Sequence, residues 1–422
     1  MIEKFAFIRD YGKLERPIRN VIASEFFIQA VNATFMNILP LYMTRKGYAD
    51  GEIALYITFR FIGVFVLALP LGNFIKGRRL MPLFFISNLC VPTFGIISIL
   101  SIAYHLPFVT PVALILWGAS FTFMQIPVFP FILRNAPKIH QTSAIALSYS
   151  TWSFGGIVSG IVIAVLDFIN PVLFDEQFIL LLFSVFGFGG LYFLNKAKVL
   201  YEVVDETEKV RSFSSVYKYK TDWGLITKAL IPTLIIATGA GLTIPFISLF
   251  FDKVHHLDKG QFSLLSFVAA LLVAYFAMMV PKIKERIGYK IAIPSTQSLA
   301  VISLVALATT QYYSQYSIAV VVAGACYLIR QPLMNMASPM TSELVLNYVG
   351  KRNREITSAL TSAIWSGSWV LSGLMVTVLF VYHFTFANIF LLTALLYAFG
   401  VLLYYFLILD YHKKEELGLI EK

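Results

Sequence analysis

The chain has 422 residues, of which 58% are hydrophobic and only 13% are charged, and its formal net charge is +10. Soluble domains have about 25% charged residues, so this composition excludes an ordinary soluble protein and indicates a chain that crosses a membrane several times. A basic net charge is also typical of nucleic-acid-binding proteins, but the distribution of the charges, described below, decides against that class.

Apolar runs of membrane-spanning length follow one another along the chain. A transmembrane helix needs about 20 apolar residues, and six such runs precede the longest polar stretch while six follow it. The first six expected helices cover residues 18–43, 52–75, 80–103, 109–133, 141–166 and 176–195. The second six cover residues 224–251, 261–281, 291–311, 317–343, 355–381 and 386–409. The sequence therefore predicts an all-α polytopic membrane protein with twelve transmembrane helices.

The polar stretch after the sixth expected helix, KAKVLYEVVDETEKVRSFSSVYKYKTDW, divides the chain into two halves. The chain begins with the charged segment MIEKFAFIRDYGKLERPIR, so we expect no cleavable signal peptide. The predicted segments are a cytoplasmic amino-terminal segment at 1–17, a six-helix bundle at 18–195, a cytoplasmic linker at 196–223, a second six-helix bundle at 224–409 and a cytoplasmic tail at 410–422.

Lys and Arg gather on one side of the expected bundle. Most of the 33 lie in segments that alternate with the outer loops, and the outer loops hold only Arg45, Lys46, Lys253 and Lys259. Because cytoplasmic loops carry the excess of Lys and Arg, this distribution places both termini in the cytoplasm and the protein in the cytoplasmic (inner) membrane. Topology explains the basic charge, and we expect no nucleic-acid partner.

The two halves resemble each other at corresponding places. Asp50 in LYMTRKGYADGEIAL aligns with Asp258 in LFFDKVHHLDKGQFSLL, and both lie in expected outer turns. ALSYSTWSFGGIVSG aligns with ALTSAIWSGSWVLSG, which places Trp152 opposite Trp365 at nearly the same spacing. Such internal similarity indicates a duplicated six-helix unit, and a duplicated bundle with both termini on one side is typical of transporters.

Two expected cytoplasmic turns share a pattern of glycine and basic residues. The turn after the second expected helix reads PLGNFIKGRRL, and the turn after the eighth reads PKIKERIGYK. Glycine permits a tight turn, and Arg and Lys can contact headgroups, carboxylates and helix carboxyl ends. With the duplicated layout, this pattern resembles the signature of the major facilitator superfamily: a Gly, an acid–Arg pair, and a second Gly followed by basic residues.

The resemblance covers essentially the whole chain and implies the transporter fold of two pseudo-symmetric six-helix bundles. The second turn keeps the acid–Arg pair, whereas the first has Phe74 and Ile75 at those positions. The resemblance implies that these turns make contacts in one state that break in another, and the alternative is that their charges only set topology. The candidate gating residues are Gly77, Arg78, Arg79, Glu285, Arg286 and Gly288.

Three ionisable residues interrupt expected helices away from their ends: Glu25, Arg60 and Arg330. A charge that faces lipid at the centre of a helix costs at least about 2.5–3.5 kcal/mol, so each is expected to face protein or a water-filled path. The resemblance implies that the first, fourth, seventh and tenth helices line a central cavity. It therefore places Arg330, about halfway along the tenth helix, at the depth of a substrate.

Polar residues recur at helical spacing near these charges. Glu25, Gln29 and Asn32 share one face of the first helix, and a similar stripe runs along the tenth. Gln125 holds the repeat-related position of Gln331, and TGAGLTIP at 238–245 predicts a seventh helix broken at its glycines. The candidate substrate and coupling residues are Glu25, Gln29, Asn32, Arg60, Gln125, Tyr327, Arg330 and Gln331.

The buried charges favour one kind of transport. An Arg presents a planar donor fork to a carboxylate or phosphate, and a buried Glu can alternate between a protonated and an Arg-paired form. The sequence therefore favours a proton-coupled symporter that imports a small organic solute with an anionic group by alternating access. For the charges themselves the alternative is a structural pair between Glu25 and Arg60 or Arg330.

The alternative function is a proton-driven exporter of drugs or amphiphiles. In the resembling family, proton antiporters usually carry an Arg in the fourth helix and a Gly-Pro motif in the fifth. Here GASFTFMQIPVF in the fourth helix has no Arg and WSFGGIVSG in the fifth has no Pro, which favours import over export.

Motifs of other protein classes are missing from the sequence. It has no H-E-x-x-H, nucleophile elbow, phosphate-binding glycine loop or paired metal carboxylates, and its polar segments are too short for a catalytic domain. Cys90 and Cys326 are interpreted as small buried apolar residues. We therefore expect no enzyme, cofactor or metal site. The expected partners are a small-molecule substrate, protons and the lipid bilayer, and the resemblance implies a monomer.

Overall fold

The computed structural model describes residues 14–75, 78–197, 222–277 and 279–417. Within these ranges the chain is α-helical with short turns and has no strand, and twelve helices are long and apolar enough to cross a membrane. The predicted fold class and the predicted number of spans are confirmed. The amino-terminal residues 1–13, Gly77, linker residues 198–221 and tail residues 418–422 lie outside the described residues.

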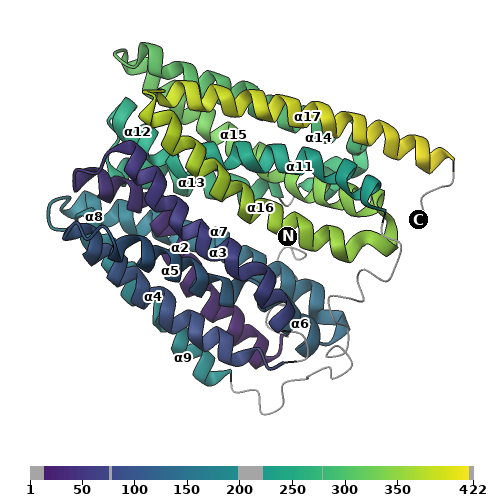
Figure 1. The fold of residues 1–422 in the computed structure, drawn as a ribbon, viewed down its shortest axis with the longest axis horizontal. Helices are drawn as coiled ribbons and strands as arrows, with labels where there is room; N and C mark the ends of the chain where they lie inside the picture. Colours follow the sequence, from purple (N-terminus) through teal and green to yellow (C-terminus); the bar gives the residue numbers. More distant parts are fainter. Residues whose placement is uncertain (1–13, 76–77, 198–221, 278, 418–422) are drawn as a thin grey trace, which may run out of the picture. The chain divides into compact units, whose positions relative to one another are not determined.

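The described chain forms two compact units, and the first holds residues 14–48 and 59–197. In this unit α2 contacts α7, α8 and α9, and α4 contacts α5 and α8 (Figure 1). Its helices are α2 (Arg16–Arg45), the later part of α3 (Asp50–Phe74), α4 (Met81–Ala103), α5 (Val109–Gln125), α6 (Val128–Asn135), α7 (Lys138–Ile169), α8 (Glu176–Gly187) and α9 (Gly189–Lys196).

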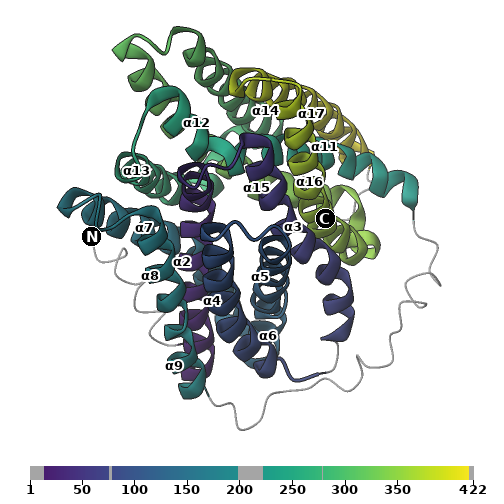
Figure 2. The ribbon, with the colours of Figure 1, turned by 60° about the vertical axis from the view of Figure 1, so that its left-hand side comes forward.

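The second unit holds residues 49–58 and 222–417. In it α17 runs alongside α14 and α11, and α15 packs on α13 and α14 (Figures 1 and 2). Its elements are the start of α3, α11 (Trp223–Thr243), the 3-10 turn η2 (Ile244–Phe246), α12 (Ile247–His255), α13 (Lys259–Ala277), α14 (Val280–Thr309), η3 (Thr310–Tyr313), α15 (Ser317–Tyr348), α16 (Gly350–Val381) and α17 (Phe386–Glu416).

One helix occupies the centre of each unit. The apolar window of α2 is 78% buried, and that of the span Trp223–His255, which begins with α11, is also 78% buried, whereas the spans within α7 and α16 each bury only 22% of theirs. α2 and α11 are the first helices of the two sequence halves, so the equal burial agrees with the internal repeat. Because most of α2 is covered by protein, it can carry polar side chains that lipid would not accept.

Several helices extend beyond the apolar runs that predicted them. α16 begins at Gly350 rather than 355, and α17 continues to Glu416 rather than 409. The added turns carry Lys, Arg and Glu, so an apolar criterion stops before them although the backbone hydrogen bonds continue. Apolar runs therefore predict the part of a helix that lipid surrounds and underestimate its ends.

Side-chain caps set the start of some spans. The carboxylate of Asp175 accepts a hydrogen bond from Phe178 N at 2.7 Å at the start of α8, and Asp222 accepts one from Leu225 N at 3.0 Å at the start of α11. These caps satisfy amide groups that have no partner within the helix.

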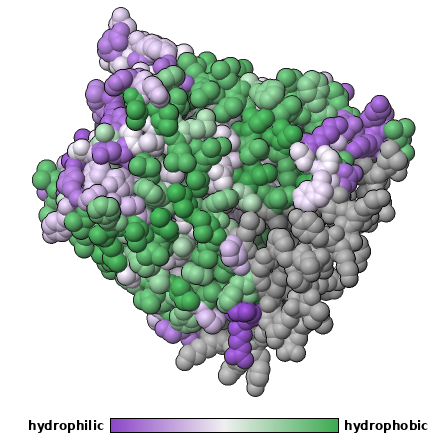
Figure 3. Space-filling model, viewed as in Figure 1, coloured by the Kyte–Doolittle hydropathy of each residue, from purple (hydrophilic) through white to green (hydrophobic). Residues whose placement is uncertain are grey.

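The surface agrees with a bilayer environment. In Figure 3 the visible face is largely apolar, and α17 is apolar along most of its length and polar at its carboxyl-terminal end. Large side chains such as Leu395, Phe399 and Phe406 are exposed along this helix. An apolar surface of this extent is unfavourable in water and is stabilised by lipid.

Candidate functional site

A buried polar cluster lies in the first unit on α2. Glu25, Gln29 and Asn32 are all buried, with exposed fractions of 3%, 4% and 8%. The amide of Asn32 donates to Gln29 Oε1 at 3.4 Å. The structure thus brings together the three residues that the spacing on the first helix predicted to share a face.

Glu25 is held by a hydroxyl of α7. The Oγ of Ser148 donates to Glu25 Oε2 at 2.6 Å, and Thr151 Oγ donates to the carbonyl of Ser148 at 2.6 Å. Within the described residues no ion pair joins Glu25 to Arg60, so the structural pair of these two residues that the sequence left open does not form here. A carboxyl group bonded only to neutral partners remains able to bind and release a proton.

Arg60 of α3 has a hydrogen bond and ring contacts within the first unit. Its Nη2 donates to Asn32 Oδ1, and its guanidinium lies 4.1 Å from the ring centroid of Trp117 on α5. The Trp117 ring also stacks with Phe35 and with Phe121. A desolvated cation over a Trp face gains about 2 kcal/mol, so this environment stabilises a buried charge without a carboxylate. These contacts indicate packing around Arg60, and its place among the substrate and coupling residues stays a prediction.

Arg330 of α15 lies in a different environment in the second unit. The side chain is 1% exposed, and its Nη2 donates to the phenol oxygen of Tyr397 on α17 at 3.3 Å. Its Nε and Nη1 have no hydrogen-bond partner within the described residues. A buried donor without a partner costs about 1–3 kcal/mol, and more where the group is charged. Arg330 is therefore a cation with unused donors.

The other predicted residues of the tenth helix have different surroundings. The ring of Tyr327 is buried against Phe251 and Phe262, at centroid distances of 5.7 Å and 6.1 Å. Gln331 on α15 and Gln125 at the end of α5 are half-buried. These ring contacts indicate apolar packing for Tyr327, whereas the partner of Arg330 lies on α17.

The seventh span is interrupted at a different place from the predicted one. α11 remains helical through Gly239 and Gly241 and ends at Thr243, and the 3-10 turn that follows contains Pro245. The glycines instead allow close packing, since a Cβ on Gly239 would lie 2.9 Å from Tyr397 Cε1. The prediction of a break at the glycines is wrong because Pro245, which lacks an amide hydrogen, interrupts the helix.

The first gating turn is anchored by an arginine that the sequence did not single out. Arg134 at the end of α6 donates from Nη1 to the carbonyl of Arg78 at 3.1 Å and from Nη2 to the carbonyl of Ile75 at 3.4 Å. The side chains of Arg78 and Arg79 are exposed, and Arg78 lies 3.9 Å from the ring centroid of Phe74. The available signal was the position of Arg134 in the next turn of the same half that the sequence predicts to be cytoplasmic.

The second gating turn contains a backbone break at the predicted glycine. Gly288 has φ 65° and ψ 174° inside α14, and the residues on both sides of it are helical. A positive φ is strained for residues with a Cβ, so this position requires glycine. Arg286 is exposed, and the side chain of Glu285 lies outside the described part.

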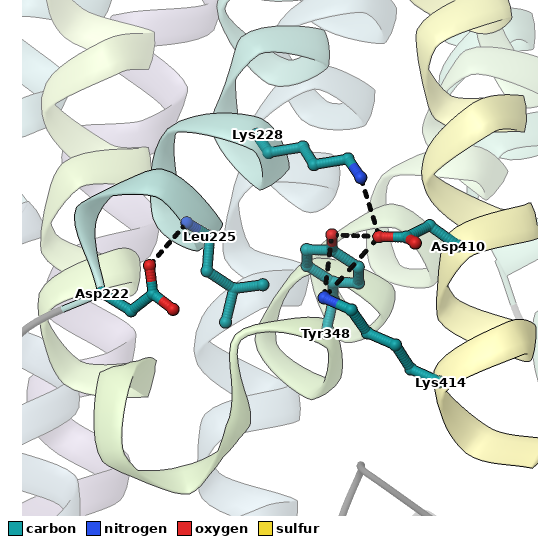
Figure 4. Close-up of polar contacts among 6 residues, drawn as sticks. All are labelled: Asp222, Leu225, Lys228, Tyr348, Asp410 and Lys414. Carbon is teal, nitrogen blue, oxygen red and sulfur yellow. Dashed lines mark hydrogen bonds and ion pairs between the residues drawn. The ribbon is translucent and has the colours of Figure 1, made fainter. Parts of the chain in front are cut away.

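A charged cluster joins three helix ends of the second unit (Figure 4). Asp410 Oδ2 on α17 lies 2.8 Å from Lys228 Nζ of α11 and accepts a hydrogen bond from the hydroxyl of Tyr348 on α15. Lys414 Nζ lies 3.6 Å from the same oxygen and 3.2 Å from Tyr348 Oη. The sequence analysis missed this Asp410 cluster, for which the spacing of Asp410 and Lys414 by one helical turn was a signal.

At the opposite helix ends, the start of α3 packs within the second unit. Lys253 of α12 forms an ion pair with Asp50, and a cavity of about 550 Å³ opens beside it. Phe380, Phe384 and His383 contribute to its lining. Among the described residues, no three His, Cys, Asp or Glu side chains gather as they do around a metal ion.

Known proteins share this fold. The family model of the Major Facilitator Superfamily matches residues 21–373. No curated protein sequence matches the chain. The structure of a D-xylose–proton symporter superposes with a TM-score of 0.71 at 13% identity, covering 92% of this chain and 95% of that chain.

Two further solved structures extend this comparison. A POT family transporter in complex with 5-aminolevulinic acid gives a TM-score of 0.72 at 14% identity and covers 94% of this chain and 96% of its own. The xylose transporter XylE from E. coli, in an inward-open conformation, gives a TM-score of 0.67 at 12% identity. The superposition covers 90% of this chain and 94% of the XylE chain. Identities this low show the fold alone. With the family match over most of its length, the chain belongs to the Major Facilitator Superfamily.

Proposed function

We propose that this transporter imports a small organic solute with an anionic group, and that a proton crosses with it. The observation that carries this proposal is the buried guanidinium of Arg330, whose Nε and Nη1 have no partner within the described residues. An anion on these donors removes the cost of the unpaired groups and adds charge-assisted hydrogen bonds. In this proposal Arg330 binds the anionic group of the substrate.

Glu25 is the proposed coupling residue. Its hydrogen bond from Ser148 stays within the first unit and leaves the carboxyl group without a cation among the described residues. A buried carboxyl group in such an environment changes its charge when it binds a proton, and the conformations that open to either side of the membrane stabilise the two forms differently. Gln29 and Asn32 complete the polar face beside it.

Two similar structures support this choice by analogy. One is described as a D-xylose–proton symporter, and another holds 5-aminolevulinic acid, which carries a carboxyl group. The proposed topology places both termini in the cytoplasm, with bundles at 18–195 and 224–409 in a monomer. Arg78, Arg79, Glu285 and Arg286 are the proposed gating side chains.

The test is proton movement driven by a carboxylate. We expect glucuronate or 5-aminolevulinate, added outside proteoliposomes that contain a trapped pH dye, to acidify the lumen. Arg330→Gln is expected to abolish this acidification because the anion loses its cation. Glu25→Gln is expected to abolish it while leaving carboxylate binding in place, since only the proton carrier is removed.

Several outcomes contradict the proposal. Acidification that persists in both variants removes Arg330 and Glu25 from the mechanism. No acidification in wild-type proteoliposomes, relative to protein-free liposomes, contradicts carboxylate–proton symport. Raised drug sensitivity in a deletion strain supports the exporter instead, because loss of an importer leaves drug tolerance unchanged.

A further inference from the structure

We propose that Tyr397 of α17 is a second ligand for the anion that Arg330 holds. This inference rests on the proposed function and adds a residue from the twelfth span, whereas the sequence placed every candidate ligand on the first, second, fourth and tenth. It follows from the donors of Arg330 and Tyr397 that lack an acceptor and from the packing that fixes the Tyr397 ring.

The phenol of Tyr397 has an unused donor. Its oxygen accepts the hydrogen bond from Arg330 Nη2 at 3.3 Å. A phenol also carries one O–H donor, and within the described residues no acceptor receives it. The hydroxyl hydrogen of Tyr397 and the Nη1 group of Arg330 therefore belong to adjacent side chains, and both lack an acceptor.

Burial makes these unused donors significant. Tyr397 and Arg330 are each 1% exposed, so water does not satisfy their donors as it would at the surface. Buried polar groups in proteins nearly always have partners, and the exceptions call for a ligand, an ion or a water molecule. One carboxylate provides acceptors for both the guanidinium and the phenol, and its charge balances that of Arg330.

The α11–α17 interface holds the Tyr397 ring in place. A Cβ on Gly239 would lie 2.9 Å from Tyr397 Cε1, so the ring rests directly on the α11 backbone. Hydroxyl pairs flank this contact along the two helices, with Thr243 and Thr393 at 2.8 Å and Thr233 and Tyr404 at 2.8 Å. A fixed ring presents its hydroxyl without further loss of side-chain entropy when an anion binds.

This pair of ligands defines a substrate class. Two donors, of which one is charged, favour an oxyanion such as a carboxylate. An amide keeps one carbonyl acceptor, but it places an N–H group where the second carboxylate oxygen would lie and leaves the charge of Arg330 unbalanced. We therefore expect a strong preference for a carboxylate over its neutral counterpart, because a site of hydrogen-bond donors is left partly unpaired by the analogue.

The experiment compares two buried tyrosines of the same helix. Tyr397→Phe keeps the ring and removes only the hydroxyl, and the matched control Tyr404→Phe removes a buried hydroxyl that pairs with Thr233 instead. Binding is read from ligand-induced thermal stabilisation of the purified full-length protein. The probes are benzoate, glucuronate and 5-aminolevulinate against benzamide, glucuronamide and 5-aminolevulinate methyl ester, at constant ionic strength.

We expect a carboxylate to stabilise the wild type and Tyr404→Phe with equal affinity, and to bind Tyr397→Phe about tenfold more weakly, as loss of one hydrogen bond to a charged group predicts. Arg330→Gln is expected to lose the response. A Tyr397→Phe variant that retains wild-type affinity and carboxylate preference, while Arg330→Gln loses both, overturns the role of Tyr397 alone. No carboxylate response in the wild type contradicts the anion site and the proposed function together.

A second pair of variants keeps the inference testable if Tyr397→Phe does not fold. Gly239→Ala pushes directly on the Tyr397 ring, whereas Gly400→Ala overpacks the same interface at Ile236, where a Cβ would lie 2.6 Å from Cγ1. Both are expected to lower the unfolding temperature by similar amounts. Only Gly239→Ala is expected to weaken carboxylate binding, and equal affinities in the two variants would contradict the positioning of the phenol.

Discussion

Arg60 and Arg330 are both arginines buried inside apolar helices, but their surroundings differ. Arg60 has a hydrogen bond to Asn32 and an indole ring 4.1 Å from its guanidinium. Arg330 has one hydrogen bond, to Tyr397, and two nitrogens without partners among the described residues. An apolar membrane environment disfavours both charges, and the protein compensates each one to a different extent.

This difference in surroundings distinguishes a role in packing from a role in ligand binding, which the positions of the two residues in the sequence do not distinguish. A charge that is compensated by groups of the fold contributes to stability and has few free hydrogen-bond donors for a ligand. A charge left partly uncompensated lowers stability and keeps its donors for a partner that arrives during function. The comparison therefore favours packing for Arg60 and supports the proposed anion binding by Arg330, and mutations at the two positions should act in opposite directions.

The largest expected effect is at Arg60. Arg60→Met removes the contact with Trp117 and leaves Asn32 Oδ1 without its donor, which together should lower the free energy of unfolding by about 3 kcal/mol. Thermal unfolding of the detergent-purified protein measures this loss. An unfolding midpoint equal to that of the wild type would show that the Trp117 and Asn32 contacts do not compensate the charge.

The opposite result is expected at Arg330. Arg330→Met removes a buried charge that lacks an ion pair within the described residues, and replacing such groups by apolar ones is often neutral or stabilising by about 1–4 kcal/mol. We expect the ligand-free variant to unfold at or above the wild-type temperature and to lose its response to carboxylates. Strong destabilisation of the ligand-free protein would instead indicate that a partner within the protein, such as Glu25, compensates this charge.

A double variant distinguishes an anion-binding Arg330 from an Arg330 that neutralises Glu25. If Arg330 neutralises Glu25, then Glu25→Gln should recover much of the stability that Arg330→Met loses, because each single change leaves one charge unpaired. If the stability changes of the two single variants are additive in the double variant, this result supports separate roles for the two residues.

The sequence predicted the spans and the internal repeat because both are visible in the order of apolar, charged and glycine residues. Twelve apolar runs correspond to twelve membrane-length helices, and Gly288 has the positive φ that its place in the turn suggested. These features depend on neighbours in sequence or on the lipid, so they need no knowledge of which helices pack together.

The partners of the buried charges were not predictable in the same way. Trp117 and Tyr397 are far from Arg60 and Arg330 in the sequence, and an aromatic residue in an apolar helix usually indicates packing. The only signal at Tyr397 was a hydroxyl group within the run FLLTALLYAFG, since a buried phenol usually finds a hydrogen-bond partner. The partner is Arg330 of α15, and the packing of α15 near α17 that brings the two together is not visible in the order of residues.

The smallest expected effect is at the Asp410 cluster, which serves as a reference for charges that are compensated near solvent. Here the same kinds of charged group are compensated near solvent: the side chain of Lys228 is 55% exposed and that of Asp410 is 26% exposed. Charges in such surroundings are already hydrated, so pairing gains little. Asp410→Asn removes the ion pairs with Lys228 and Lys414 but retains an acceptor for the hydroxyl of Tyr348.

We therefore expect Asp410→Asn to lower the free energy of unfolding by about 1 kcal/mol or less, and this loss should shrink as salt is raised because salt screens exposed pairs. Thermal unfolding of Asp410→Asn and Arg60→Met at low and high ionic strength measures both effects. The Arg60→Met loss should be independent of salt, because a cation buried over an indole ring is shielded from mobile ions. Equal salt dependence at the two positions would contradict the distinction between charges compensated by packing and charges compensated by solvent.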